Sequence, residues 1–222
     1  MLGAAALLHH IDSPGPGVTL TRSITLPART VSVDTTGDLR TGVLASLDQG
    51  RPDLIATLPA AARPSIAASL GLDDADLDPD LRPEVLSTGL RYLIVPVRSG
   101  DALARARISR EDFGRFLGGH GAEFAYILHA AALEGRHWNN DGIIEDVATG
   151  SAAGCVAAYL MRHQRILHGE AARLHQGRFA GRPSRIDITA FGDPASVDRV
   201  VVAGQVVRVA TGRLDALPPE AT

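Results

Sequence analysis

The chain has 222 residues, 45% of them hydrophobic, which is enough for one large domain or two small ones around a sizeable core. A net charge of −3 and a pI near 6.2 give no reason to expect nucleic acid or an acidic membrane surface as a partner. All 22 basic residues are arginines, and this excludes a lysine Schiff base and the lysine of a P-loop.

The cysteine content and the amino-terminal segment bear on the compartment. Cys155 is the only cysteine, so the chain can form no internal disulfide and offers no cysteine pair for a metal. The first ten residues lack a basic segment and their apolar run is short, unlike a signal peptide. No stretch is long enough to span a membrane. We therefore expect a soluble, cytoplasmic protein that does not bind membranes.

The first part of the chain predicts a helix followed by strands. Leu2–Ile11 is rich in alanine and leucine, and Ser13–Gly17 breaks it with prolines and glycines. Apolar and polar residues alternate over Val18–Leu26 and Arg29–Val33, which predicts an antiparallel hairpin. Gly37–Gly50 is ambiguous.

The middle of the chain predicts alternating strands and helices. Composition and periodicity give, in order, the strand Asp53–Leu58, the helix Ala60–Leu70, the surface linker Gly71–Pro83, a buried strand within Thr88–Val97, the helix Ser109–Leu117 with Ser109 as its N-cap, and the strand Glu123–Ala131.

The last third predicts one buried helix and several strands. The helix is Ala152–Gln164, and the strands are Arg173–Gln176, Ser184–Thr189, Val200–Val202 and Gln205–Val209, with Ala203-Gly204 as the turn of the last hairpin. No glycine-rich dinucleotide fingerprint is present, which disfavours a nucleotide-binding Rossmann fold. Gly3–His10 resembles Gly154–His163, either by chance or because the fold is duplicated.

The segment that carries the most chemical information is Asn140–Gly154. Two carboxylates, Glu145 and Asp146, lead into a turn of small residues that opens the buried helix. Backbone N–H groups at the start of a helix have no partner within it and favour a bound carboxylate or phosphate. Asp146 lies one turn earlier, where it can act as an acid or base. The alternative is that Ser151 caps the helix and that the two acids only offset its dipole.

This segment resembles the signature of a known family. Glu145–Gly154 matches the Glu-Asp-Pro-Ala-Thr-Gly-Ser-Ala-Ala-Gly motif of the PhzF family of phenazine-biosynthesis-type isomerases except at Val147. Ser87–Val97, Gln176–Ser184 and Leu2–Ala5 resemble other segments of that family, a relative of diaminopimelate epimerase. The likeness spans nearly the whole chain.

The resemblance implies an α+β fold of the diaminopimelate epimerase type. Its two pseudo-symmetric halves each form a curled, mainly antiparallel sheet around a central helix. On this basis residues 1–62 are an incomplete first half and residues 63–222 are the second half, with the last strand able to return to the first half.

The resemblance also implies an activity, an isomerase or epimerase that transfers a proton on a small carboxylated metabolite without a cofactor or a metal. Asp146 would be the acid/base, and Thr149, Gly150 and Ser151 would bind the substrate carboxylate. A homodimer is expected. The family's glutamate acid/base and its Gly-His-Pro-Thr histidine would precede Met1, so the alternative is a truncated, non-catalytic small-acid binding or assembly subunit.

Several histidines and one tryptophan invite other interpretations. The spacing of His163, His168 and His175 matches no strong metal-ligand pattern, and we expect solvated surface histidines. His137 and Trp138 precede the motif, and they either line the cleft or pack in the core.

Overall fold

The computed structural model describes residues 1–12, 14–15, 17–26, 30–38 and 40–212. Ser13 and Pro16 of the expected break, and Arg29 at the start of the expected second strand, lie outside the described residues. The expected first helix is confirmed as α1 (Leu2–Asp12). The expected hairpin is confirmed by β1 (Thr19–Thr25) and β2 (Thr30–Asp38), which pair antiparallel.

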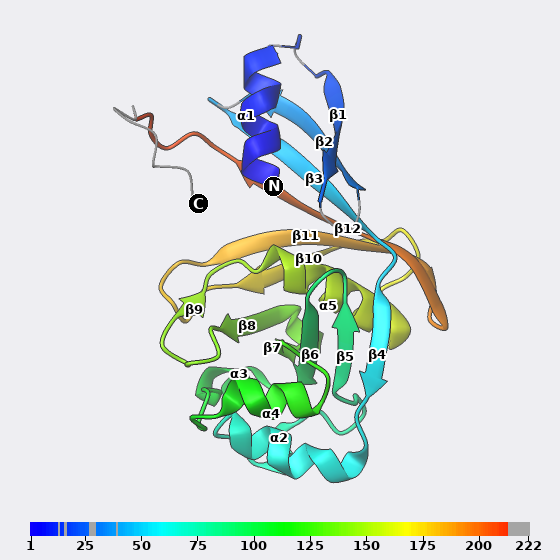
Figure 1. Cartoon of the computed structure of the whole chain (residues 1–222), viewed down its shortest axis with the longest axis vertical. Helices are drawn as coiled ribbons and strands as arrows, with labels where there is room; N and C mark the ends of the chain where they lie inside the picture. The colour runs from blue at the N-terminus through cyan, green and yellow to red at the C-terminus, as the bar shows by residue number, and fades with distance from the viewer. Residues whose placement is uncertain (13, 16, 27–29, 39, 213–222) are drawn as a thin grey trace, which may run out of the picture.

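The ambiguous segment before residue 50 forms a third strand, β3 (Gly42–Gly50), which pairs with β2. Helix α1 packs on these strands through Ala5 and Ala6, both fully buried, as the upper part of Figure 1 shows. His9 is also buried and lies 2.9 Å from Thr35 Oγ1 through its Nδ1 atom, so α1 is fixed by a polar contact as well.

The remaining elements follow in chain order. They are β4 (Asp53–Thr57), α2 (Arg63–Ser69), β5 (Glu84–Ser87), β6 (Arg91–Pro96), α3 (Gly100–Arg105), α4 (Phe113–Gly119), β7 (Phe124–His129), β8 (Glu134–Trp138), β9 (Glu145–Asp146), α5 (Gly150–Arg162), β10 (Ala171–Gln176), β11 (Ser184–Asp193) and β12 (Ser196–Val206).

The strands of the described residues form one continuous curled sheet. Its order is β1-β2-β3-β12-β11-β10-β8-β7-β6-β5-β4, with β9 paired to β8. Helix α5 lies inside the curl, in contact with β5, β6, β11 and β12, and every residue from Ala152 to Met161 is buried. The expected α+β class is confirmed.

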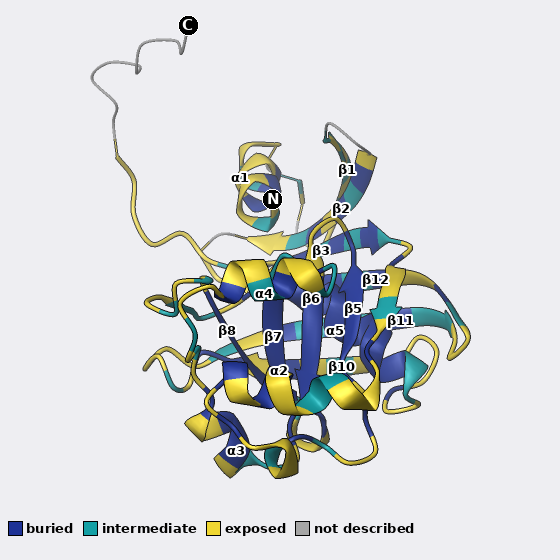
Figure 2. Ribbon diagram, turned by 60° about the horizontal axis from the view of Figure 1, so that its bottom comes forward, coloured by how far each residue is buried: buried dark blue, intermediate teal, exposed yellow. Residues whose placement is uncertain are grey.

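A second layer of short helices covers the other face of the central strands. In β6, Tyr92 and Ile94 point into the core around α5, whereas Leu93 and Val95 point into a core beneath α2, α3 and α4. Figure 2 shows these helices as ribbons with buried inner and exposed outer faces in front of the buried strands β6 and β7. In the described part of the chain no helix is both long and apolar enough to cross a membrane.

The last predicted hairpin is wrong. Ala203 and Gly204 lie inside the single strand β12, where they pair with Ser46 and Ala45 of β3. Pairing on both edges keeps these residues in the strand, because β12 also pairs with β11 through Ala203 and Asp187. One strand therefore connects the β1–β3 region with the strands around α5.

The linker and one helix start are also corrected. The segment 71–83 is irregular, but Leu72, Leu77 and Leu81 are buried in it, so it covers the core rather than lying free on the surface. Ser109 caps no helix, because α4 begins only at Phe113, and its hydroxyl donates instead to Ala68 O at 2.6 Å. The division of the chain at residues 62 and 63 stays a prediction.

Candidate active site

The carboxylate of Asp146 lies in a short turn that ends at the start of α5. Its Oδ2 atom accepts a hydrogen bond from Thr149 Oγ1 at 2.8 Å, and its Oδ1 atom accepts one from Ala148 N at 3.3 Å. The N-cap residue of α5 is Thr149, so the alternative in which Ser151 caps the helix is wrong. Ser151 lies within the first turn, one residue after Gly150.

Gln176, at the end of β10, holds this turn in place by hydrogen bonds. Its Oε1 atom accepts from Thr149 N at 3.2 Å and from Tyr126 Oη at 3.1 Å. Its Nε2 atom donates to Asp146 O at 2.7 Å and to Thr149 Oγ1 at 2.9 Å. The side chain is 1% exposed, so these contacts are shielded from water and hold the turn in one geometry.

Glu145 forms a buried ion pair rather than a free charge beside the helix dipole. Both of its carboxylate oxygens accept from Arg136, at 2.9 and 2.8 Å. The guanidinium also donates to three backbone carbonyls at the carboxyl end of α3, those of Leu103, Ala104 and Ala106. Arg136 therefore anchors β9, and with it the neighbouring Asp146, to the α3 region.

Polar side chains from other elements hold the first turn of α5. Ser151 Oγ and Tyr92 Oη lie 2.8 Å apart. Burial raises the pKa of Tyr92, so this hydroxyl is neutral at physiological pH. Gln49 Nε2 donates to Gly150 O at 2.9 Å, and Thr88 Oγ1 donates to Gln49 Oε1, also at 2.9 Å.

A cavity of about 370 Å³ opens where the starts of α1 and α5 approach each other. Gly150 and Ser151 line it from α5, and a Cβ added to Gly150 would meet nothing within 4 Å. None of the lining side chains is charged. The lining consists of Met1, Leu2, Leu26, Val31, Leu47, Gln49, Thr88, Gly89, Leu90, Gly150, Ser151 and Val202.

The four predicted site residues thus occupy two places. Gly150 and Ser151 border the cavity, whereas Asp146 and Thr149 are not in its lining and face each other in the turn just before the helix. Thr149 is buried and donates its backbone N–H to Gln176. The catalytic and binding roles of these residues stay predictions.

His137 and Trp138, for which two interpretations were open, are both buried. His137 is the cross-strand partner of Asp146 between β8 and β9, and its Nδ1 atom lies 2.8 Å from Ala125 O. Burial lowers the pKa of His137. Trp138 packs in the core beneath α2–α4 and stacks on the guanidinium of Arg136 at 4.4 Å. His137 is therefore the one of the two that neighbours Asp146.

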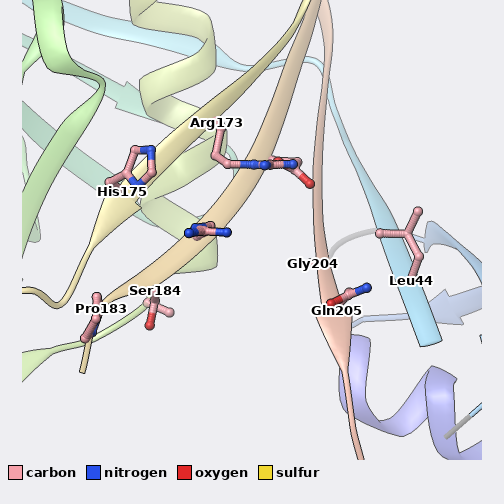
Figure 3. Close-up of a pocket in the computed structure, with 10 residues that line it drawn as sticks. Leu44, Arg173, His175, Pro183, Ser184, Gly204 and Gln205 are labelled. Atoms are coloured by element: carbon pink, nitrogen blue, oxygen red, sulfur yellow. The ribbon is translucent and has the colours of Figure 1, made fainter. Parts of the chain in front are cut away.

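A larger hollow of about 790 Å³ lies on the outer face of the sheet, as Figure 3 shows. Arg173 and His175 of β10 point into it opposite Gln205 of β12 and Leu44 of β3. Neither Asp146 nor the first residues of α5 line it, although Ala148 of the Asp146 turn does. No group of three or more histidine, cysteine or acidic side chains in the described residues is arranged to hold a metal ion.

The sequence indicated some of these residues better than others. Gln176, Thr88 and Tyr92 lie in segments that carry the family resemblance, but the resemblance implied no role for them. Gln49 lies in the segment that periodicity left ambiguous, and no local signal distinguishes it.

Comparison with known proteins identifies related sequences. The profile of the PhzC-PhzF family, described as phenazine biosynthesis-like protein, matches residues 21–212. The trans-2,3-dihydro-3-hydroxyanthranilate isomerase of Pseudomonas aeruginosa is 35% identical over 136 residues, which is 59% of this chain and 46% of that protein. The chain spans about half of the length of the curated relatives that it matches.

Solved structures show the same fold. A predicted epimerase from Pseudomonas aeruginosa is 40% identical, with a TM-score of 0.88 over 97% of this chain and 73% of that one. A phenazine biosynthesis protein of the PhzF family from Bacillus anthracis is 22% identical, with a TM-score of 0.72 over 93% and 72% of the two chains. The second likeness concerns the fold alone. The expected epimerase-like architecture is confirmed.

Proposed function

The chain belongs to the PhzC-PhzF family of phenazine biosynthesis-like proteins, and we propose that it carries the site of an isomerase for a small carboxylated metabolite. The reaction would remove a proton from one carbon of the substrate and return a proton to another, without a cofactor. The observation that supports this best is the position of the Asp146 turn directly before the start of α5, where the helix borders a cavity of about 370 Å³.

The proposed roles follow from position. The backbone N–H groups of Gly150 and Ser151 lie at the amino end of a 13-residue helix, where the helix dipole favours an anion. They would bind the substrate carboxylate, while the uncharged side chains that line the cavity would accommodate the rest of the molecule. Asp146 would transfer the proton, and Thr149 would hold its carboxylate in place by the 2.8 Å hydrogen bond.

Deuterium exchange tests this proposal. The test compound is trans-2,3-dihydro-3-hydroxyanthranilate, the compound in the name of the related Pseudomonas aeruginosa isomerase. It is incubated with the protein in D₂O, and the incorporation of deuterium is followed by mass spectrometry. Asp146→Asn should slow incorporation by about 10²–10⁴-fold, the usual contribution of a positioned acid/base. Asp101→Asn, the same change on the exposed surface of α3, is the control. If the Asp146→Asn protein incorporates deuterium at the wild-type rate, Asp146 is not the acid/base of the reaction.

A second function is favoured by one observation. Both oxygens of the Asp146 carboxylate are engaged by Thr149 and Ala148, and Asp146 does not line the cavity. A non-catalytic small-acid binder or assembly subunit would need only the helix start and the cavity. Calorimetry measures whether the wild-type protein binds the carboxylate. Binding without deuterium incorporation would support this alternative over the isomerase.

The remaining expectations are also proposals. We expect a homodimer that acts in the cytoplasm and binds neither nucleic acid nor membranes. Light scattering coupled to size-exclusion chromatography gives the mass in solution and checks the dimer.

A further inference from the structure

The side chain of Gln49 connects three segments that are far apart in the sequence. It leaves the end of β3, is 5% exposed, and places its carboxamide against the first turn of α5. The Nε2 atom donates to Gly150 O, the first residue of the helix, and the Oε1 atom accepts from Thr88 between β5 and β6. Both contacts are 2.9 Å long.

The surrounding residues are shaped for this carboxamide. A Cβ at Gly154 would lie 1.9 Å from Gln49 Oε1, so the absence of a side chain one turn into α5 makes the space that the carboxamide fills. Thr88 Oγ1 lies 3.4 Å from Ser151 O and extends the contact along the same turn. Gln49 and Thr88 also line the cavity beside Gly150 and Ser151.

We propose that Gln49 is a positioning residue, whose carboxamide fixes the first turn of α5 at the place from which Gly150 and Ser151 face the cavity. This inference rests on the proposed function, because it assigns to Gln49 the placement of the carboxylate-binding N–H groups. Gln49 acts through the helix rather than on the substrate. Loss of the carboxamide lets the first turn move relative to β3 and weakens carboxylate binding.

The chain contains a natural reporter for this movement. Cys155, its only cysteine, lies in α5 directly after Gly154, is fully buried, and donates through Sγ to Leu86 O at 3.5 Å. Burial raises the pKa of the Cys155 thiol to about 12, and a disulfide reagent reacts with thiolate, so labelling requires the helix start to open. Labelling needs no substrate, and it therefore tests the positioning role even where the exchange reaction fails.

The experiment measures the rate of Cys155 labelling by an aromatic disulfide reagent in the native protein at low urea concentrations. Gln49→Met, which keeps the length but removes both hydrogen bonds, should speed labelling about tenfold. Gly154→Ala, which displaces the carboxamide, should do the same. Thr88→Val should also speed labelling, whereas Thr88→Ser keeps the hydroxyl and should stay near the wild-type rate. Gln205→Met, on the outer face of β12, is the matched control.

Two readouts separate positioning from general loss of stability. Opening of the first turn alone gives a labelling rate that hardly depends on urea, whereas global unfolding gives a rate that rises steeply with it. In the exchange assay, Gln49→Met should raise KM for the probe carboxylate about tenfold with a smaller change in kcat. Three results would each overturn the proposal. The Gln49→Met protein could be labelled at the wild-type rate, its faster labelling could follow the urea dependence of global unfolding, or its KM could be unchanged.

Discussion

At the scale of single residues, Gln176 shows how one buried amide can determine the geometry of a turn. Its four polar contacts engage the backbone and side chain of Thr149, the carbonyl of Asp146 and the hydroxyl of Tyr126. Family resemblance located the segment that contains Gln176. The contact set could not be predicted from the sequence, because the partners lie 27 to 50 residues away along the chain.

Replacement of Gln176 should therefore be costly. Gln176→Leu leaves the buried Thr149 N–H and Tyr126 hydroxyl without their acceptor, and each such loss costs about 1–3 kcal/mol. We expect the free energy of unfolding, measured by urea denaturation, to fall by about 3 kcal/mol. Gln205→Leu, at an exposed position of β12, should change it by less than about 0.5 kcal/mol. Equal effects of the two substitutions would contradict this account.

Arg136 and Glu145 provide a second prediction at the same scale. Their side chains are only 9% and 11% exposed, so removal of one charge leaves the other buried and unpaired. Arg136→Met should lower the free energy of unfolding by about 3 kcal/mol, and adding Glu145→Gln should restore part of it. Arg173→Met breaks the exposed pair with Asp187 and should cost less than about 1 kcal/mol. Purely additive effects of the first two changes would rule out a coupled pair.

At the scale of elements, composition predicted α1, the small-residue turn and the apolar run after it predicted α5, and the alternation of apolar and polar residues predicted the first hairpin. Strands β5 and β8 were not predicted, because strands that are buried on both faces lack the alternation of apolar and polar residues that indicates a half-exposed strand. The same limit explains the error at Ala203-Gly204. A pair of small residues is typical of a turn, but here pairing with β11 and β3 keeps it inside a strand.

Proline substitution distinguishes the two descriptions of β12. Ala203 pairs with Asp187 on one side and with Ser46 on the other, so Ala203→Pro removes a ladder hydrogen bond inside the sheet, whereas the predicted turn would tolerate it. We expect a loss of about 3 kcal/mol or more in urea denaturation. Val209→Pro lies beyond the strand at an exposed residue, where the predicted hairpin would have placed a paired strand, and should be nearly neutral. A large effect at residue 209 would contradict the observed end of β12.

At the scale of the whole molecule, the sheet runs without interruption from β1 to β4 in the described residues. The sequence predicted its α+β class and one buried helix through the motif and the resemblance. The order of the strands was not predictable from local patterns, because pairing between distant segments, such as β8 with β10, leaves no local mark in the sequence. For the same reason the cavity between the starts of α1 and α5 appears only in the structure.

The carboxylate of Glu84 joins the far end of α5 to the sheet. It accepts from Thr57 of β4 at 3.0 Å and from Arg162 of α5 at 3.2 Å, and it lies 3.6 Å from His163 Nε2. Burial alone would raise its pKa, but His163 and Arg162 outweigh that effect and hold the pKa below the ordinary value of 4.5. The folded protein therefore binds fewer protons at this group than the unfolded chain as the pH falls through that value.

The sign of the pH dependence follows from this difference in proton binding. Glu84 contributes its full stabilisation above pH 4.5, and the contribution declines as the pH falls below that value toward the pKa of the folded state. Glu84→Gln should lower the free energy of unfolding by about 2 kcal/mol at pH 7, and the gap to the wild-type protein should narrow in acid. Urea denaturation between pH 7 and pH 3.5 measures both curves, with the exposed Glu111→Gln as the control. A gap that stays constant over this range would mean that the charge of Glu84 does not connect α5 to the sheet.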